Sequence, residues 1–260
     1  MPFAVRAVDL MRVNSLTKYP SIPTYHPLDA SNGAILDDVR RPPPGELIAT
    51  EKVDGTNARI LLLPDGTYLI GSRDELLYAK GDLLANPSLG IAAAVRPFAE
   101  SLPTPEREEI HVVYGEVYGG KVSAASREYT STQAVGFRLF DVAILENAPE
   151  RLAMSVPEIV TWRDNGGQRF LSETELQEFA TKHGLKLVPR ITRLAARDLP
   201  SDPDAVLTLL EEWLPTSRVR LDPDAGGEPE GLVVRTADRS WIAKIRYEDY
   251  RRKKRRKKRS

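Results

Sequence analysis

Short apolar segments of the kind that forms β-strands recur along the chain, and tight turns connect several of them in pairs. Residues 46–63 contain an apolar stretch, a polar turn and a second apolar stretch, and residues 67–72 follow as a return strand. Between them, Pro64-Asp65-Gly66 favours a hairpin turn, because proline fixes φ and glycine accepts a positive φ. The same pattern of short apolar segments bounded by turn residues predicts strands at 111–122, 134–145, 230–236 and 240–247. A chain of connected hairpins folds mainly into antiparallel sheets.

Helical patterns lie between these predicted strands. Residues 86–101 predict a helix, and residues 204–214 predict an amphipathic helix after an Asp-Pro start. Ser172 and Glu175 have the spacing of a capping box, so a helix is expected from there to Gly184. We also expect a short strand at 185–191, a linker at 215–229 and irregular, proline-rich chain over 1–47. Hairpins interleaved with helices indicate the α+β class.

The composition excludes several classes of protein. The chain of 260 residues contains no cysteine, which excludes a disulfide scaffold, a thiol nucleophile, cysteine-ligated zinc and iron–sulfur clusters. His26, His111 and His183 are scattered without the spacing of metal ligands, and we interpret them as surface or core residues. No apolar run approaches the roughly 18 residues that a membrane helix needs. Since the N-terminus does not read as a secretion signal, we expect a cytoplasmic protein that does not bind membranes.

The charges are distributed unevenly, although the formal net charge is zero. Residues 251–259 are nine consecutive lysines and arginines, so the remainder of the chain is acidic. We predict a disordered tail over 251–260, because a dense block of like charges repels itself. Such a tail can bind nucleic acid through counterion release, and the alternatives are a solubilising tail or a partner for the acidic body. The candidate nucleic-acid contacts are Arg251, Arg252, Lys253, Lys254, Arg255 and Arg256.

A lysine at the end of a predicted strand is the first candidate for chemistry. Lys52 lies in the sequence Glu51-Lys52-Val53-Asp54-Gly55, where Asp-Gly predicts a tight turn beside the amine. A lysine becomes a nucleophile when burial or neighbouring cations favour its neutral amine. Taken alone, this short motif is also typical of an ordinary hairpin turn with a solvated lysine.

Further short motifs follow this lysine in order, each at the edge of a predicted strand. They contain Glu116 in YGEVYGG, Asp141 in FRLFDV, Glu230 in EGLVVR, and Lys244 and Arg246 in WIAKIR. Each motif alone is also typical of a charged strand end or of a strand in the core. Together they supply carboxylates and cations, which attack on a polyphosphate requires because charge must be neutralised at the transferred phosphoryl group.

On these motifs the chain resembles the covalent nucleotidyltransferases, a superfamily of ATP-dependent DNA ligases, RNA ligases and mRNA capping guanylyltransferases. Thr56-Asn57 after the lysine motif, and KYPSIPTYHP at 18–27, are similar to the T4 RNA ligase 2 type. The resemblance implies one α+β nucleotidyltransferase domain over 1–250, an ATP-grasp-like ligase adenylation fold with two mainly antiparallel sheets flanked by helices. Beyond it we expect only the basic tail 251–260 and no separate C-terminal domain.

The resemblance also implies a role for each motif residue. The expected catalytic residues are Lys52 as nucleophile, Asp54, Glu230, Lys244 and Arg246. Arg246 stands where ligases of this type usually have a second lysine. The expected nucleotide contacts are Glu51, Asn57, Arg73, Glu116, Phe140, Asp141, Arg235 and Lys244. Glu116 and Glu230 are the expected ligands of Mg²⁺ or Mn²⁺, because carboxylates suit hard cations.

The function that the resemblance implies is ATP-dependent ligation of RNA. Lys52 is adenylated, AMP passes to a 5′-phosphate, and a 3′-OH then seals the strand; a nicked duplex is the favoured substrate. A partner protein is expected to prepare the ends or to help bind the substrate. The alternatives are a DNA ligase, another adenylyl- or guanylyltransferase of the superfamily, an enzyme that adenylates something other than RNA, and a non-catalytic nucleic-acid-binding protein with a ligase fold.

Overall fold

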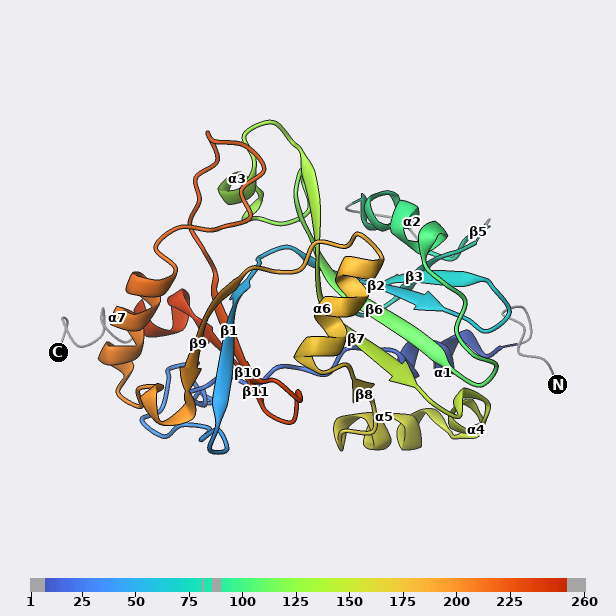
Figure 1. The fold of residues 1–260 in the computed structure, drawn as a ribbon, viewed down its shortest axis with the longest axis horizontal. Helices are drawn as coiled ribbons and strands as arrows, with labels where there is room; N and C mark the ends of the chain where they lie inside the picture. Colours follow the sequence, from blue (N-terminus) through green and yellow to red (C-terminus); the bar gives the residue numbers. More distant parts are fainter. Residues whose placement is uncertain (1–7, 81, 86–89, 252–260) are drawn as a thin grey trace. The chain divides into compact units, whose positions relative to one another are not determined.

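The computed structural model describes residues 8–80, 82–85 and 90–251. The chain forms two compact units, and each has its own sheet. The large-sheet unit comprises Met1–Pro20, Gly55–Ser126 and Gln133–Leu187, and the small-sheet unit comprises Ser21–Asp54, Arg127–Thr132 and Val188–Ser260. All strand pairings in both sheets are antiparallel, as the hairpin pattern predicts. The prediction of the α+β class with two antiparallel sheets and flanking helices is therefore confirmed (Figure 1).

The sheet of the large-sheet unit has seven strands in the order β5-β4-β3-β2-β6-β7-β8. Their bounds are β2 (Thr56–Leu62), β3 (Tyr68–Ser72), β4 (Leu76–Ala79), β5 (Asp82–Leu83), β6 (Ile110–Gly119), β7 (Val135–Leu145) and β8 (Arg169–Phe170). The predicted hairpin joins β2 to β3, with Gly66 at a φ of 78° and Asp65 accepting hydrogen bonds from Thr67. The long β6 and β7 are the predicted strands at 111–122 and 134–145, each within a few residues.

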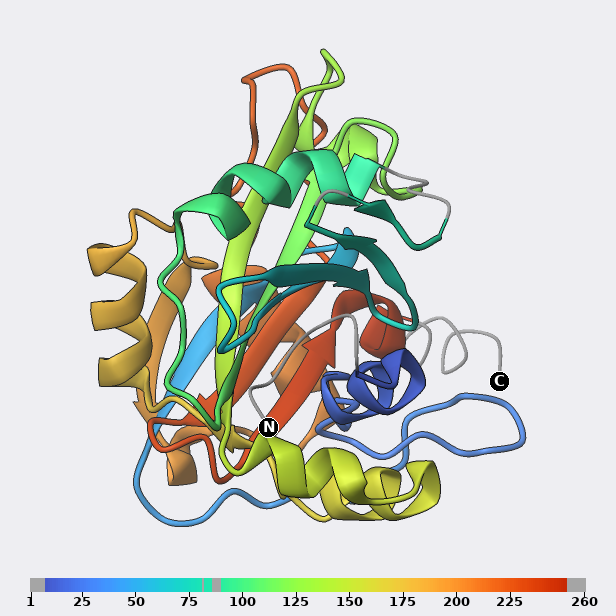
Figure 2. The same cartoon turned by 90° about the vertical axis from the view of Figure 1, so that its right-hand side faces the viewer.

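Helices pack against both faces of this sheet (Figures 1 and 2). Helix α2 (Ile91–Ser101) and helix α6 (Glu173–Lys182) pack against the face that presents Ile60, Val113 and Leu139. The other face presents Leu61 and Val112 to helices α1 (Leu10–Leu16), α4 (Ala148–Ala153) and α5 (Val156–Asp164). The one-turn helix α3 (Ser126–Tyr129) follows β6.

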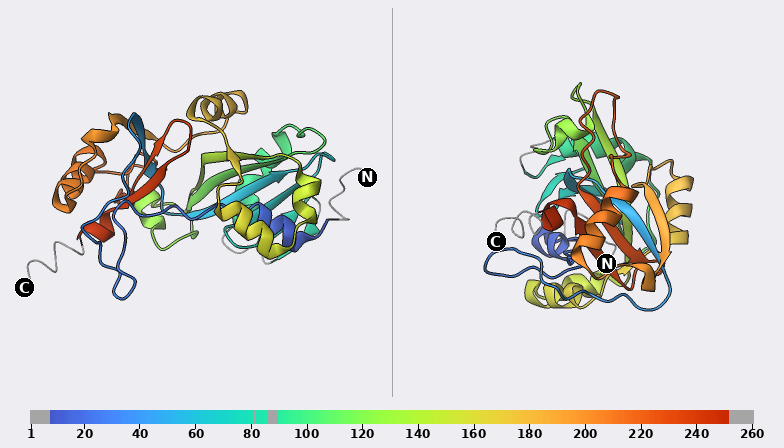
Figure 3. Two further views of the ribbon diagram at one scale, coloured as in Figure 1. Left: turned by 90° about the horizontal axis from the view of Figure 1, so that it is seen from below. Right: turned by 90° about the vertical axis from the view of Figure 1, so that its left-hand side faces the viewer.

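The sheet of the small-sheet unit has four strands in the order β11-β10-β1-β9. Their bounds are β1 (Glu46–Lys52), β9 (Arg190–Ala195), β10 (Gly231–Thr236) and β11 (Ile242–Arg246). One face presents Leu47, Leu232 and Ile245 to a core that helix α7 (Pro203–Trp213) completes. The left-hand view of Figure 3 shows this helix beside the small sheet, seen from below. The short 3₁₀ helix η3 (Ala196–Asp198) follows β9. Among the described residues, no helix is both long and apolar enough to cross a membrane.

Three local predictions need correction. Residues 1–47 are not irregular throughout, because the Asp9 side chain accepts hydrogen bonds from the backbone of Met11 and Arg12 and caps helix α1. The strand predicted at 185–191 begins only at Arg190, directly after Pro189, whose ring nitrogen has no hydrogen to donate to a ladder. The helix predicted at 86–101 begins at Ile91, and residues 86–89 and the tail residues 252–260 lie outside the described residues.

Candidate active site

Lys52 is the last residue of the central strand β1 in the small-sheet unit. The register of β1 and β10 places Lys52 opposite Gly231, so Glu230 lies at the same end of the sheet. The Lys52 Nζ atom donates to the Glu230 Oε2 atom at 2.6 Å. The two side chains are partly buried, with exposed fractions of 26% and 17%. The structure thus brings together the expected nucleophile and the expected metal ligand.

Burial and neighbouring positive charges shift the pKa of Glu230 in opposite directions. Removal from water disfavours the carboxylate and raises the pKa of Glu230, while the ammonium of Lys52 and the guanidinium of Arg246 lower it. The balance leaves the pKa of Glu230 above its ordinary value. Because Lys52 is hydrogen-bonded to this carboxylate, its lone pair becomes available only when it loses a proton and the ion pair opens.

The expected cations of the last motifs lie on the same face of the small sheet as Lys52. Side chains alternate between the two faces of a strand, and the register pairs Gly231 with Arg246 and Val233 with Lys244. Arg235, two residues after Val233, shares this face and is only 4% exposed. The opposite face is the apolar one that packs on helix α7. The sheet therefore separates a core face from a cationic face.

Arg246 is already paired in this structure. Its guanidinium forms ion pairs with Asp249 at 3.0 Å and with Glu248 at 2.7 Å. Burial alone would lower the pKa of Arg246, but the hydrogen bonds and charges of these carboxylates outweigh burial and raise it. Its expected role in phosphate binding therefore requires an exchange of carboxylate for phosphate.

The residues on either side of Lys52 have well-defined partners. The buried carboxylate of Glu51 accepts from the Ser217 hydroxyl at 2.5 Å and from the Arg218 backbone at 2.9 Å. The Asp54 backbone N–H donates to the Tyr129 hydroxyl at 2.7 Å. These contacts fix the backbone around the lysine, and they give Glu51 a structural partner in addition to its expected contact with the nucleotide.

In the large-sheet unit, the expected nucleotide contacts Asn57 and Glu116 lie side by side on one face of the sheet. Asn57 of β2 lies opposite Glu116 of β6, which lies opposite Arg138 of β7. The Glu116 carboxylate accepts from the Gly55 backbone N–H at 3.2 Å. The Asn57 Oδ1 atom is buried and has no hydrogen-bond partner, so it can accept a hydrogen bond from a ligand. Arg73 is exposed and follows β3.

Phe140 and Asp141 lie at a bulge in β7, where the register with β6 shifts. The half-buried ring of Phe140 lies edge-on to Tyr19, with centroids 5.0 Å apart. The Tyr19 hydroxyl donates to Asp141 at 2.8 Å. A bulge changes the direction of side chains on a strand, and here it presents two consecutive residues of the FRLFDV motif to the same tyrosine.

Three residues to which the sequence analysis assigned no role contact the expected site residues. Arg138 lies opposite Glu116, Tyr19 contacts Phe140 and Asp141, and Tyr129 binds the backbone of Asp54. The strand alternation in VGFRLFDV could have indicated Arg138. Tyr19 lies in the KYPSIPTYHP segment that supports the family resemblance, but the local sequence does not indicate the contacts of either tyrosine, because their partners are far away in the chain.

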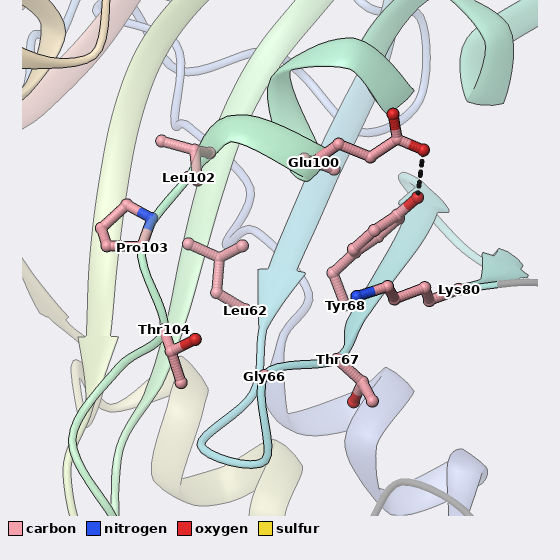
Figure 4. A pocket seen from close by; sticks show the side chains of 10 residues that line it. Leu62, Gly66, Thr67, Tyr68, Lys80, Glu100, Leu102, Pro103 and Thr104 are labelled. Carbon is pink, nitrogen blue, oxygen red and sulfur yellow. Dashed lines mark hydrogen bonds between the residues drawn. The ribbon is translucent and has the colours of Figure 1, made fainter.

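A shallow pocket lies elsewhere in the large-sheet unit (Figure 4). It has a volume of about 190 Å³ and lies between the β2–β3 turn and the end of helix α2. The Tyr68 hydroxyl donates to Glu100 at its rim at 3.3 Å. None of the expected site residues lines this pocket. In the described part of the chain, no group of three or more histidine, aspartate or glutamate side chains could by itself hold a metal.

The chain belongs to the RNA ligase family. The family model for RNA ligases matches residues 45–254, which include Lys52, Glu230 and the strands of both sheets. None of the curated proteins compared matches this sequence significantly. The finer assignment to the T4 RNA ligase 2 type stays a prediction.

Solved structures of RNA ligases share the fold of this chain. A mutant of Naegleria gruberi RNA ligase with ATP and Mn has a TM-score of 0.53 at 16% identity, covering 80% of this chain and 51% of that chain. The same ligase with PPi has a TM-score of 0.52 at 16% identity, covering 81% of this chain and 52% of that chain. An archaeal ATP-dependent RNA ligase has a TM-score of 0.51 at 17% identity, covering 90% of this chain and 49% of that chain. The chain therefore spans about half the length of these relatives.

Proposed function

We propose that the chain is an ATP-dependent RNA ligase that seals 3′-OH and 5′-phosphate ends through a lysyl-AMP intermediate on Lys52. One observation carries the proposal. The end of the central strand holds a partly buried lysine 2.6 Å from a partly buried glutamate, on a sheet face that also presents Arg235, Lys244 and Arg246. Membership of the RNA ligase family and the ATP-bound relatives support the same chemistry.

The first step forms a bond between the Lys52 nitrogen and the α-phosphorus of ATP. The bond from that phosphorus to the bridging oxygen breaks, and pyrophosphate leaves with the electron pair. Lys52 gives up its protons as the bond forms. Arg235, Lys244 and Arg246 neutralise charge on the phosphates, which matters more for phosphoryl transfer than covalent help. AMP then passes to the RNA 5′-phosphate, and attack by the 3′-OH releases it.

The residues present fit ATP and a divalent cation. The buried, unpartnered Oδ1 atom of Asn57 suits a hydroxyl or amine donor of the nucleotide, and the half-buried ring of Phe140 suits stacking on adenine. Glu116 and Glu230 offer two carboxylates. Mg²⁺ usually keeps several waters and binds one or two carboxylates together with substrate phosphates, and it would supply charge neutralisation at the phosphates. We assign Glu51, Asp54, Arg73 and Asp141 supporting roles around the nucleotide.

The finer features of the proposal rest on the sequence. A nicked RNA duplex is the favoured substrate, and a partner protein would prepare its ends or help to bind it. The catalytic domain would extend over 1–250, and the cations from Arg251 onward would bind the RNA backbone. A cytoplasmic location is part of the same proposal.

The decisive test is transfer of α-labelled ATP to the protein in the presence of magnesium. We expect a labelled, acid-labile protein band that Lys52→Ala abolishes and that Lys182→Ala, an exposed lysine of helix α6, leaves unchanged. Absence of label on the unmodified protein would refute the proposal. Labelling by GTP instead would identify a guanylyltransferase, and equal sealing of nicked DNA and nicked RNA would favour the alternative of a DNA ligase.

A further inference from the structure

The backbone that follows Lys52 leaves its sheet immediately. Lys52 is the last residue of β1 that pairs with β10, so the ladder no longer orients residues 53 and 54. The first hydrogen bond beyond the ladder joins the Asp54 N–H to the Tyr129 hydroxyl at 2.7 Å. The direction of the lysine side chain depends on the backbone on both sides of it, and Tyr129 restrains the side that the sheet does not.

Tyr129 is well suited to hold this backbone in place. Its side chain is fully buried, and burial raises the pKa of its hydroxyl far above the ordinary value. The phenol therefore stays neutral at any working pH and accepts the Asp54 hydrogen bond unchanged. The residues around it, Arg127–Thr132, belong to the small-sheet unit although the chain on both sides belongs to the large-sheet unit.

A second loop of the small-sheet unit fixes this segment. The backbone N–H groups of Leu221, Gly226 and Gly227 donate to the carbonyls of Tyr129, Arg127 and Glu128 at 2.8, 3.0 and 2.9 Å. The Asp222 carboxylate accepts from Thr130 and from both the backbone and hydroxyl of Ser131. We name residues 127–131 and 217–228 the paired loops.

The paired loops, together with Glu230 just beyond them, contact the lysine segment at three successive points. Ser217 and Arg218 hold Glu51, Tyr129 holds Asp54, and the second loop continues directly into Glu230, which holds Lys52. The nucleophile is thus restrained before, at and after its own position by one hydrogen-bonded assembly. Misplacement of a reacting group by about 1 Å can cost about a hundredfold in rate, so such restraint has a chemical consequence.

We infer that Tyr129 is a positioning residue for the adenylation of Lys52, acting through the Asp54 backbone and supported by the paired loops. The inference rests on the proposed function. It predicts an effect on the chemical step and little effect on ATP binding, because Tyr129 is fully buried and its hydrogen bond is to the backbone of the lysine segment at Asp54. It also predicts that loosening the paired loops at a distance, through Asp222, slows the same step.

The test compares two buried tyrosines of the small-sheet unit. Tyr129→Phe removes the acceptor for Asp54, and Tyr250→Phe is the matched control, because Tyr250 is also buried and its hydroxyl is hydrogen-bonded to His26 at 2.8 Å. Single-turnover labelling with α-labelled ATP gives the rate constant at saturation and the ATP concentration at half-maximal rate. Thermal unfolding by circular dichroism and the labelled amplitude report the folded fraction.

For Tyr129→Phe we expect a saturating rate constant at least tenfold lower, with the half-maximal ATP concentration changed less than twofold. For Tyr250→Phe, the saturating rate constant and the half-maximal ATP concentration should both stay within twofold of the values for the unmodified protein. Equal rate constants for the two variants would overturn the inference, whereas an unmodified protein that takes no label would refute the proposed function itself. If Tyr129→Phe does not fold, Asp222→Asn decides: a threefold or greater loss in rate supports the inference, and an unchanged rate overturns it.

Discussion

Arg59 is a fully buried guanidinium in the large-sheet unit. It donates to the Asn14 carbonyl and the Thr17 hydroxyl, each at 3.0 Å, and to the Asn14 side chain. Burial lowers the pKa of Arg59 to about 10, because the charged form loses its water. The residue remains charged at neutral pH, and it ties helix α1 to the middle of the sheet.

Replacing Arg59 by methionine should lower the free energy of unfolding by about 3 kcal/mol, because Asn14 and Thr17 would keep buried acceptors without a donor. Urea denaturation measures the change, and Arg96→Ala, at an exposed arginine of helix α2, should leave the value nearly unchanged. A loss for Arg59→Met no larger than that of the control would contradict this account of how helix α1 is held.

Two glycines of the sequence motifs are required by backbone packing. A Cβ atom on Gly55 would lie 2.2 Å from the Val117 carbonyl oxygen, and one on Gly231 would lie 2.1 Å from the Ile245 carbonyl oxygen. Both contacts are with backbone atoms. These two positions are therefore explained by the close approach of neighbouring strands next to Lys52 and Glu230.

At the scale of elements, helix α6 has the capping box that Ser172 and Glu175 predict. The Glu175 side chain accepts from the Ser172 backbone at 2.7 Å, and the Ser172 hydroxyl accepts from the Glu175 backbone at 3.4 Å. Hydrogen bonds to the Glu175 carboxylate from the Ser172 hydroxyl and from the Ser172 backbone lower the pKa of Glu175, despite the small opposing effect of burial. Because the folded-state pKa is depressed, the stabilisation is present above the unfolded value and is lost as pH falls through the folded value.

Glu175→Ala should therefore destabilise the protein at pH 7, and its effect should vanish at pH values below the depressed pKa. Urea denaturation at pH 7 and at the acid end of a series that extends to pH 2 measures both values. Glu178→Ala, at an exposed position on the same helix, is the matched control and should show no such dependence. An effect of Glu175→Ala that is equally large at both pH values would show that the carboxylate charge has no part in the cap.

The elements show how far the sequence predicts the fold. Signals confined to a few residues were correct, such as the capping box at Ser172 and the turn at Gly66. Helix α1 was missed because its single cap, Asp9, precedes a short segment near proline-rich chain. The order of the motifs alone does not predict the ion pair of Lys52 and Glu230. The two residues were expected in one site only because the family resemblance assigns them to it. The contact between Tyr129 and Asp54 could not be predicted, because it depends on which loops the fold brings together.

At the scale of the whole molecule, the basic tail is the remaining feature of the sequence. Its first residue, Arg251, forms an ion pair with Glu228 and lies over the Tyr247 ring, 4.5 Å from its centroid. Residues 252–260 lie outside the described residues. Their proposed role in RNA binding is therefore a matter of charge, and it can be tested without a structure of the tail.

Replacing the lysines and arginines of 252–259 by glutamine should weaken RNA binding and flatten its dependence on salt, because each neutralised phosphate contributes about 0.7 to the slope on single strands. Fluorescence anisotropy with a labelled RNA across a salt series gives the slope. A chain in which the lysines of 252–259 become arginines and the arginines become lysines keeps the charge and should behave like the unmodified protein. An unchanged slope in the glutamine variant would show that the tail does not bind the RNA.

The order of strands in the small sheet has a consequence for protein synthesis. Strand β1 lies between β9 and β10, and Lys52 is made 178 residues before its partner Glu230. While the chain is on the ribosome, the lysine therefore emerges long before the strands that orient it. Under the proposed function, we expect a chain that a stalled ribosome releases early to carry Lys52 without Glu230 and to take no label from ATP.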